Sequence, residues 1–326
     1  MIKESHMRVI LTGANGFVGI HLKDYLTQRG HKVFCLSSSK SSKYSIESFL
    51  KGQLDKYISE FNPNSCIHLA AIAHKNKFYS IANENNIFKV NAELPLYIAK
   101  YCIKFRVSRF IYLSSIGVHG LPREPINELT PITPLNLYSR SKYFAECSLV
   151  EFFKSTIKSS LVIIRPPLIY GAKAKGNLRK LYNLVKTGLP IPLGEINNYR
   201  SLIGINNLCS AIEVTLIKEL QNISTFVISD NETISTFQLI KNMESSIRSQ
   251  SRIYSIPKEI FNLLRNIGFF KRTISSLIDN HIIDSSLFKE TLGWRQPLTQ
   301  HEEMLICYPS KKLNHKTFRN KSNNLN

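Results

Sequence analysis

The stretch Arg8-Val-Ile-Leu-Thr-Gly-Ala-Asn-Gly-Phe-Val-Gly19 decides the fold of this chain, because a short apolar run breaks into glycines and resumes as the amphipathic segment 21–29. The pattern predicts a strand, a tight turn and a helix. Gly13, Gly16 and Gly19 are spaced so that the turn can adopt unusual dihedral angles and the backbone can approach a pyrophosphate. An ordinary strand-to-helix turn is the alternative, but the flanking strand and helix favour a dinucleotide site at the helix N-terminus.

Length and composition limit the class of protein. The 326 residues, 43% of them hydrophobic, suffice for one large α/β core and a smaller lobe. No apolar run approaches the roughly 18 residues of a membrane helix, and the first apolar run is already the nucleotide strand rather than a signal peptide. We therefore expect a cytoplasmic protein without a transmembrane segment.

The cysteines give no sign of a disulfide framework or a metal site. They are scattered along the chain without a Cys-x-x-Cys pair or histidines at zinc spacing. We expect buried thiols at all six positions: Cys35, Cys66, Cys102, Cys147, Cys209 and Cys307.

The chain is strongly basic, with a formal net charge of +20. Part of this excess lies in the segment 309–326, which contains lysines and arginines but no acidic residue and is predicted to be a disordered tail. The charge could attract anionic nucleotide sugars, a phospholipid surface or RNA. Because no interleaved basic and aromatic motif is present, a solvated basic surface is favoured and no nucleic-acid partner is expected.

Apolar strands alternate with helical segments through the first half of the chain. Strands are predicted at 32–36, 66–71, 109–115 and 160–165, with a helix from about residue 85. This alternation predicts an α/β fold with a parallel sheet. Ligands of such sheets bind beyond the carboxyl ends of the strands, which places Ser114 and Ser115 for chemistry, whereas His68 is expected to be a packed strand residue.

The residues after the second strand bear on cofactor choice. Ser37, Ser38 and Ser39 stand where an NAD-binding unit usually has an acid that holds the ribose 2′-hydroxyl, and Lys40 and Lys43 follow. Without the acid, nothing repels a 2′-phosphate. The sequence therefore permits NAD or NADP and mildly favours NADP.

A candidate acid/base pair lies at the start of a predicted helix. Tyr138 and Lys142 are four residues apart, so both lie on one helix face. An ammonium there would favour the phenolate and lower the pKa of Tyr138, while a serine hydroxyl could bond the reacting oxygen. The spacing alone is common, but here it follows a glycine turn and a strand that ends in two serines.

Together these segments resemble the extended branch of the short-chain dehydrogenase/reductase superfamily, the NAD(P)-dependent nucleotide-sugar epimerases, dehydratases and 4-keto reductases. The motifs that carry the resemblance are 12–19, His68-Leu-Ala-Ala71, Val90-Asn91, Ser114-Ser-Ile-Gly-Val-His-Gly120 and Tyr138-Ser-Arg-Ser-Lys142. Two departures are the missing acid after strand two and the missing acidic pair near the adenine.

The resemblance implies specific roles. It makes Ser115, Tyr138 and Lys142 the catalytic residues, and it makes Asn91 a helix-supporting residue. Lys142 would also hold the nicotinamide ribose. The implied cofactor contacts are Gly13, Asn15, Gly16, Phe17, Val18, Gly19, Ser37, Leu69, Ala70, Ala71, Asn91 and Lys142. No metal is implied.

The resemblance also implies the domain organisation. Residues 1–170 form a doubly wound parallel Rossmann sheet that binds NAD(P), and residues 171–308 are mainly a smaller C-terminal substrate-binding lobe with some segments returning to the sheet. In that lobe Asn177 and Arg200 would meet the pyrophosphate of a UDP-sugar, for which an arginine fork is suited, and Ser115 and Tyr138 would meet the sugar. A loop is expected at 188–194 and helices at 234–247, 258–277 and 284–294.

The implied reaction is hydride transfer at a sugar carbon. Ile116 and Gly117 follow Ser115 where dehydratases of the family have an acid, so dehydration is disfavoured. The second half most resembles enzymes of surface-polysaccharide (O-antigen or capsule) biosynthesis that reduce a 4-keto UDP-N-acetyl-6-deoxyhexosamine. A UDP-hexose or UDP-N-acetylhexosamine 4-epimerase is the close alternative, and a non-catalytic nucleotide sensor or RNA-binding protein is a remote one. The family implies a possible homodimer.

Overall fold

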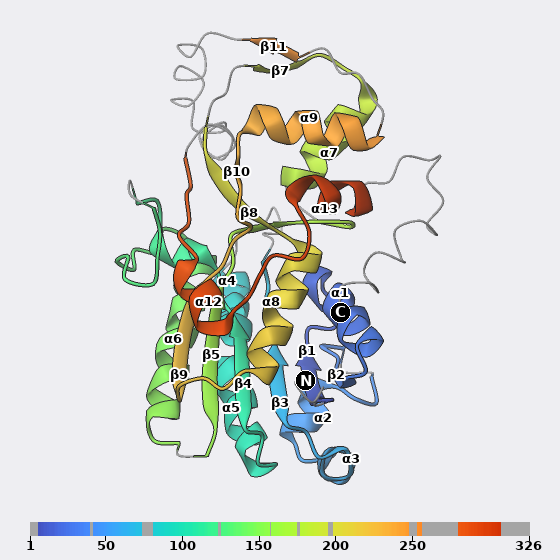
Figure 1. Ribbon diagram of the computed structural model, residues 1–326. Coiled ribbons are helices and arrows are strands. Elements are labelled where there is room, and N and C mark those ends of the chain that lie inside the picture. The colour runs from blue at the N-terminus through green and yellow to red at the C-terminus, as the bar shows by residue number, and fades with distance from the viewer. Residues whose placement is uncertain are drawn as a thin grey trace. The chain divides into compact units, whose positions relative to one another are not determined.

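A computed structural model describes residues 6–39, 42–73, 81–122, 125–156, 158–174, 177–194, 198–247, 253–255 and 280–307 (Figure 1). The tail 309–326, the expected helices at 258–277, and Lys40 and Lys175 lie outside the described residues. The chain forms two compact units. Unit 1 comprises Met1–Pro167, Asn206–Ser229 and Asp284–Arg295, and unit 2 comprises Leu168–Ile205, Asp230–Ile283 and Gln296–Asn326.

Unit 1 is built on a six-stranded parallel sheet with the order β2-β1-β3-β4-β5-β9. The strands are β1 (Arg8–Thr12), β2 (Lys32–Leu36), β3 (Ser65–His68), β4 (Arg109–Leu113), β5 (Ser160–Arg165) and β9 (Ile223–Val227). The helices are α1 (Phe17–Gln28), α2 (Ile46–Leu50), α3 (Asp55–Phe61), α4 (Ile81–Phe88), α5 (Leu94–Lys104), α6 (Leu137–Lys154), α8 (Ile205–Ile217) and α12 (Ser286–Leu292).

The strand order identifies the ligand-binding end of the sheet. The chain runs from β1 to one neighbour, β2, and then crosses to the other neighbour, β3. The winding direction reverses between β1 and β3, and in doubly wound sheets ligands bind beyond the carboxyl ends of the strands at this reversal. The predicted α/β fold with a doubly wound parallel sheet is confirmed.

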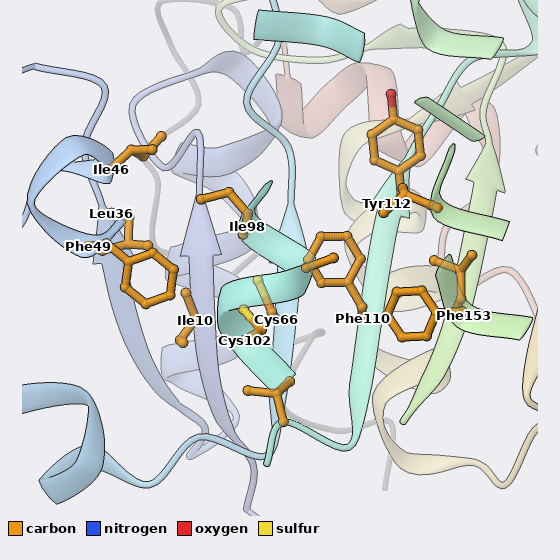
Figure 2. Close-up of a cluster of buried hydrophobic side chains, with 14 of the residues drawn as sticks. Ile10, Leu36, Ile46, Phe49, Cys66, Ile98, Cys102, Phe110, Tyr112 and Phe153 are labelled. Atoms are coloured by element: carbon orange, nitrogen blue, oxygen red, sulfur yellow. The ribbon is translucent and has the colours of Figure 1, made fainter. Parts of the chain in front are cut away.

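One face of the sheet packs on α2, α5 and α6 (Figure 2). Because strand side chains alternate between faces, Ile10, Cys66 and Phe110 point to this side and Val9, Ile67 and Ile111 to the other. The strands are apolar on both faces, as strands covered by helices on both sides must be. The core therefore holds the carboxyl ends of β1 and β3 in a fixed register.

In its described residues, unit 2 has two small sheets and three helices. β8 (Arg200–Gly204) pairs with β10 (Thr233–Ile234) and β6 (Leu168–Tyr170), and β7 (Ile191–Gly194) pairs with β11 (Ile253–Ser255). The helices α7 (Asn177–Thr187) and α13 (Gln300–Cys307) both pack on α9 (Thr236–Ile247). Tyr170 donates a hydrogen bond to Asp230, whose carboxylate also accepts from the Gly204 amide, and this buried group ties β6 to β8.

Three local predictions are wrong. The loop at 188–194 contains β7, which pairs with one strand among the described residues, and an edge strand tolerates a proline such as Pro192. The helix from about residue 85 is interrupted by a π-helical turn at Lys89–Glu93, between α4 and α5. Cys147 is exposed on the outer face of α6 and Cys35 is half-buried, so only the other four thiols are buried as predicted.

Candidate active site

The glycine turn after β1 forms a close-packed cradle. Gly13 has φ of +72°, and a Cβ on it would lie 2.7 Å from the Ala70 nitrogen. A Cβ on Gly19 would lie 2.1 Å from the Gly13 oxygen. Only glycine fits at these two positions without a clash. The helix α1 begins immediately after the turn, with Gly16 as its N-cap, and no side chain caps its first amides. This geometry suits a pyrophosphate.

The predicted cofactor residues flank this cradle. Asn15 and Gly16 are exposed at the turn, and Phe17 and Val18 are half-buried in the first turn of α1. Leu69, Ala70 and Ala71 follow β3 and are half-buried. The contacts at Gly13 bring these two loops together. The cradle thus fits the phosphates of a dinucleotide, and the cofactor contacts of the individual residues stay predictions.

His68 fixes the end of β3. Its Nδ1 lies 3.0 Å from the Thr12 hydroxyl oxygen, and its ring stacks with Phe110 and Tyr112. Burial, with a smaller contribution from the charge of Lys142, lowers the pKa of His68 to about 3, so the ring is neutral. His68 is a packed strand residue, as predicted.

Asn91 joins three segments through its carboxamide. Its Oδ1 accepts a hydrogen bond from the Ile72 amide at 2.7 Å, and its Nδ2 donates to the Ile72 carbonyl at 3.1 Å and to the Ser141 hydroxyl at 3.2 Å. Ser141 in turn donates to the Tyr138 carbonyl at 2.8 Å. The fully buried Asn91 therefore ties the loop after β3 to α6. Its position in the π-helical turn was not predictable from spacing.

α6 carries Tyr138 and Lys142 on one face. The helix begins with a capping box in which Asn136 and Ser139 exchange hydrogen bonds. The Lys142 ammonium is buried, donates to the Leu113 carbonyl at 2.7 Å, and lies 4.6 Å from the centre of the Tyr112 ring. Lys142 is thereby held against the end of β4.

The predicted effect of Lys142 on Tyr138 is wrong for this structure. Burial raises the pKa of Tyr138 to about 12. Burial lowers the pKa of Lys142 to about 7, although the Glu146 carboxylate opposes this shift. The loss of hydration thus acts on both groups in favour of their neutral forms, and the ammonium is directed to a backbone carbonyl.

Ser115 begins the 3₁₀ turn Ile116–His119 as its cap. Its hydroxyl oxygen accepts a hydrogen bond from the Gly117 amide at 3.1 Å. A Cβ on Gly117 would lie 3.7 Å from the Ser139 Cβ, so this turn packs against the first turn of α6. Next to it, Ser114 is buried and its hydroxyl has no hydrogen-bond partner among the described residues. The structure thus brings Ser115 beside the helix of Tyr138 and Lys142.

Ser37 lies just beyond β2. Its backbone pairs with Tyr44 and Ile46, and its hydroxyl accepts a hydrogen bond from the Ser39 amide at 3.1 Å. Lys43 lies 5.3 and 4.9 Å from the ring centres of Tyr44 and Tyr57. The neutral serines and the exposed Lys43 thus both follow the carboxyl end of β2 in the chain.

Three further residues at this end were not singled out from the sequence. Arg165, the last residue of β5, forms a buried ion pair with Glu146 on α6 through its Nε and Nη2 atoms. Its remaining nitrogen, Nη1, lies within hydrogen-bond distance of His119 Nε2. Two sequence signals could have indicated these residues: the position of Arg165 at the end of a predicted strand, and the spacing of four residues between Lys142 and Glu146. Their partners lie 19 and 46 residues away in the chain.

The two residues predicted to bind the pyrophosphate of the UDP-sugar lie in unit 2. Arg200 begins β8 and is half-buried, and Asn177 begins α7, although its side chain is outside the described part of the chain. Lys173 is exposed before α7 and has a positive φ. Within the described ranges there is no cluster of potential metal ligands and no helix long and apolar enough to span a membrane.

The sequence matches a family model and several curated proteins. The model of the NAD dependent epimerase/dehydratase family matches residues 9–228. A UDP-glucose 4-epimerase of Vibrio cholerae is 29% identical over 304 residues, which cover 90% of this chain and 92% of that protein. An N-acetyl-alpha-D-glucosaminyl-diphospho-ditrans,octacis-undecaprenol 4-epimerase of Escherichia coli O157:H7 is 25% identical, with coverage of 82% and 83%.

The fold is also found among solved structures. The UDP-glucose 4-epimerase of Stenotrophomonas maltophila, with bound NAD and formylated UDP-arabinopyranose, superposes with a TM-score of 0.74 and 17% identity. The superposition covers 93% of this chain and 97% of that one.

Proposed function

Because the chain belongs to the NAD dependent epimerase/dehydratase family, we propose that it is a UDP-sugar 4-epimerase. Its substrate would be a UDP-hexose or a UDP-N-acetylhexosamine, used in the cytoplasm for a surface polysaccharide. The observation that supports the proposal is that Ser115 follows β4, that Lys142 donates to the Leu113 carbonyl at the end of that strand, and that Tyr138 lies one helical turn before Lys142. Nine-tenths of the chain is also similar to an epimerase.

Tyr138 is the acid/base of the proposed reaction. A bound nicotinamide would accept a hydride from C4 and return it to the opposite face. In its tyrosinate form Tyr138 takes the proton of the C4 hydroxyl as the hydride leaves, and as the resulting phenol it gives that proton back in the reverse step, while the Ser115 hydroxyl bonds the same oxygen. Lys142 holds the cofactor ribose, and its ammonium is fixed in place by the hydrogen bond to the Leu113 carbonyl.

The binding residues follow from the same proposal. The cradle of Gly13, Gly16 and Gly19 holds the cofactor pyrophosphate, and the loop of Leu69, Ala70 and Ala71 passes beside it. Arg200 and Asn177 bind the pyrophosphate of the UDP-sugar, for which a guanidinium is suited. The serines after β2 are neutral and Lys43 follows them, so nothing there repels a 2′-phosphate. We therefore expect the protein to use NADP at least as well as NAD.

A 4-keto reductase is the second candidate. The segments 165–171, 188–194 and 198–201 resemble those of reductases that act on a 4-keto UDP-N-acetyl-6-deoxyhexosamine. The curated relatives named above are epimerases, which places the epimerase first. The two reactions differ in cofactor use, since a reductase consumes one reduced cofactor for each sugar and an epimerase consumes none.

A homodimer is the proposed oligomeric state. α5 and α6 pack side by side in unit 1 and expose the aromatic rings of Tyr97 and Phe144, which are 55% and 51% exposed. Burial of such rings against a second copy would be favourable. Light scattering of the purified protein tests this proposal, and a mass near 37 kDa at all concentrations would contradict it.

The deciding experiment compares products and cofactor. The purified protein is incubated with UDP-glucose, UDP-galactose, UDP-N-acetylglucosamine or UDP-N-acetylgalactosamine and catalytic NAD or NADP, and the sugars are separated by chromatography. We expect interconversion of one C4 pair without a net change in nicotinamide absorbance. Stoichiometric consumption of NAD(P)H with a 4-keto sugar, and no interconversion, would instead identify the reductase.

A further inference from the structure

Arg165 uses all three guanidinium nitrogens at the carboxyl end of β5. Its Nε donates to Glu146 Oε1 at 3.1 Å and its Nη2 to Glu146 Oε2 at 2.6 Å. Its Nη1 lies 3.1 Å from His119 Nε2, and His119 Nδ1 lies 2.9 Å from the Thr130 carbonyl oxygen. Since that carbonyl can only accept, the His119 proton is on Nδ1 and Nε2 accepts from Arg165. Burial and the charge of Arg165 lower the pKa of His119, which favours the neutral ring.

The two partners of Arg165 belong to the two elements that carry the candidate catalytic residues. His119 ends the 3₁₀ turn that Ser115 begins. Glu146 lies one helical turn beyond Lys142 and two beyond Tyr138 on α6. The carbonyls of Ile164 and Pro166, on either side of Arg165, accept hydrogen bonds from the Ser114 and Ile116 amides. One end of β5 thus holds both elements.

We propose that Arg165, with Glu146 and His119, is a positioning residue that fixes the separation between the Ser115 hydroxyl and the Tyr138 hydroxyl. The inference rests on the proposed function, in which both hydroxyls must meet one sugar oxygen. A rigid planar fork is needed because a lysine could not bind both carboxylate oxygens and the imidazole in this geometry.

Stability alone is a poor reason for this arrangement. The side chains of Arg165 and Glu146 are only 9% and 3% exposed, so the pair loses most of its hydration. Replacing such a buried pair by apolar residues of similar size is often neutral or stabilising, whereas removing one partner is strongly destabilising. The double variant Glu146→Leu/Arg165→Met should therefore fold and lose the alignment.

The test measures kcat, KM and the NADH dissociation constant of this double variant in the full chain. We expect kcat to fall about 10- to 100-fold, the usual effect of a displacement near 1 Å, with KM and NADH binding within about threefold of wild type. His119→Phe should lower kcat in the same way, and His119→Gln, which can still accept from Arg165, should recover part of the loss. The matched control is Glu213→Leu/Arg29→Met, another Arg–Glu pair of unit 1, for which kcat should not change.

A second measurement does not depend on turnover. Crystal structures of the wild type and the Glu146→Leu/Arg165→Met variant give the distance between the Ser115 and Tyr138 hydroxyl oxygens, which should differ by about 1 Å. An unchanged distance, or a folded double variant with the kcat of active wild type, overturns the inference. A wild-type protein that converts no UDP-sugar would overturn the proposed function, and the crystallographic distance would still decide the role of Arg165.

Discussion

The two ends of the central sheet carry the same three kinds of side chain in opposite arrangements. At the carboxyl end, Arg165 is the centre and binds both Glu146 and His119. At the amino end, Glu213 of α8 is the centre and accepts hydrogen bonds from Arg29 at 2.6 Å, from His31 at 3.0 Å and from Tyr25 at 3.2 Å.

The histidines of the two groups have opposite tautomers. His31 Nδ1 accepts from the Met7 amide at 3.0 Å, so its proton is on Nε2 and is donated to Glu213. His119 instead accepts through Nε2. The carboxylate-centred group ties α1 and the start of β2 to α8, whereas the arginine-centred group ties two elements that carry Ser115, Tyr138 and Lys142. The same side chains therefore stabilise the fold at one end and are proposed to align a site at the other.

The largest expected effect is a difference in kcat between variants of two tyrosines, one at each end of the sheet. Tyr138→Phe should lower kcat by about two to four orders of magnitude, the usual effect of losing a positioned acid/base, with cofactor binding nearly intact. Tyr25→Phe, which removes the hydroxyl that donates to Glu213, should lower only thermal stability. Steady-state kinetics and thermal unfolding of both variants check this, and equal kcat values for both variants would remove Tyr138 from the mechanism.

The next largest effect is expected from the replacement of an asparagine at each end of the sheet. Asn91→Leu removes the carboxamide that joins Ile72 to Ser141, so α6 should shift and kcat should fall about 10- to 100-fold. Asn64→Leu removes an acceptor for the Arg8 amide before β3, at the amino end, and should cost about 1–3 kcal/mol of stability without a change in kcat. The kcat of each variant, measured well below its unfolding temperature, is the deciding quantity.

The buried Lys142 predicts a pH dependence of stability. Its folded-state pKa of about 7 lies below the usual 10.5, so between these values the unfolded chain binds more protons and stability rises with pH. The stability of Lys142→Met relative to wild type should therefore be greater at pH 6 than at pH 10, by about 4 kcal/mol. Urea unfolding at both pH values measures the difference, and a pH-independent difference would contradict burial of the ammonium.

The control for this prediction lies at the amino end. Lys32→Met makes the same change at an exposed position of β2, where stability should stay within about 0.5 kcal/mol at either pH.

The smallest expected effect concerns the cofactor. Ser37→Asp should shift the preference toward NADH about tenfold, because a carboxylate there repels a 2′-phosphate and can bind the 2′-hydroxyl. Ser108→Asp adds the same charge before β4 at the amino end and should leave the ratio unchanged. The ratio of kcat/KM for the two cofactors is the measurement. A wild-type protein with a strong NADH preference would show that the ribose site is misplaced.

Local patterns in the sequence predict much of unit 1. These patterns depend on residues that are close together in the chain. The glycine spacing after β1 predicts the turn before α1, the alternation of apolar and helical segments predicts the strands and helices of the sheet, and the Tyr138/Lys142 spacing predicts the start of α6. The family match confirms the predicted family, while the roles of the individual site residues stay predictions.

Long-range contacts could not be predicted in this way. The pairing of Glu146 with Arg165 and of Arg165 with His119 depends on how α6, β5 and the 3₁₀ turn converge. The pKa values of Tyr138 and Lys142 depend on burial, which spacing does not reveal, and this is why the predicted lowering for Tyr138 is wrong. The strand β7 was missed because its partner β11 lies some 60 residues later.

The fate of a deuterium at C4 tests the central claim most directly. UDP-glucose labelled with deuterium at C4 is incubated with the purified protein and NAD or NADP, and the product is analysed by mass spectrometry and NMR. We expect UDP-galactose that retains the deuterium at C4, because the hydride leaves and returns at the same carbon, and we expect Tyr138→Phe to lose this conversion. Conversion with loss of the label to solvent, or undiminished conversion by Tyr138→Phe, would contradict the account.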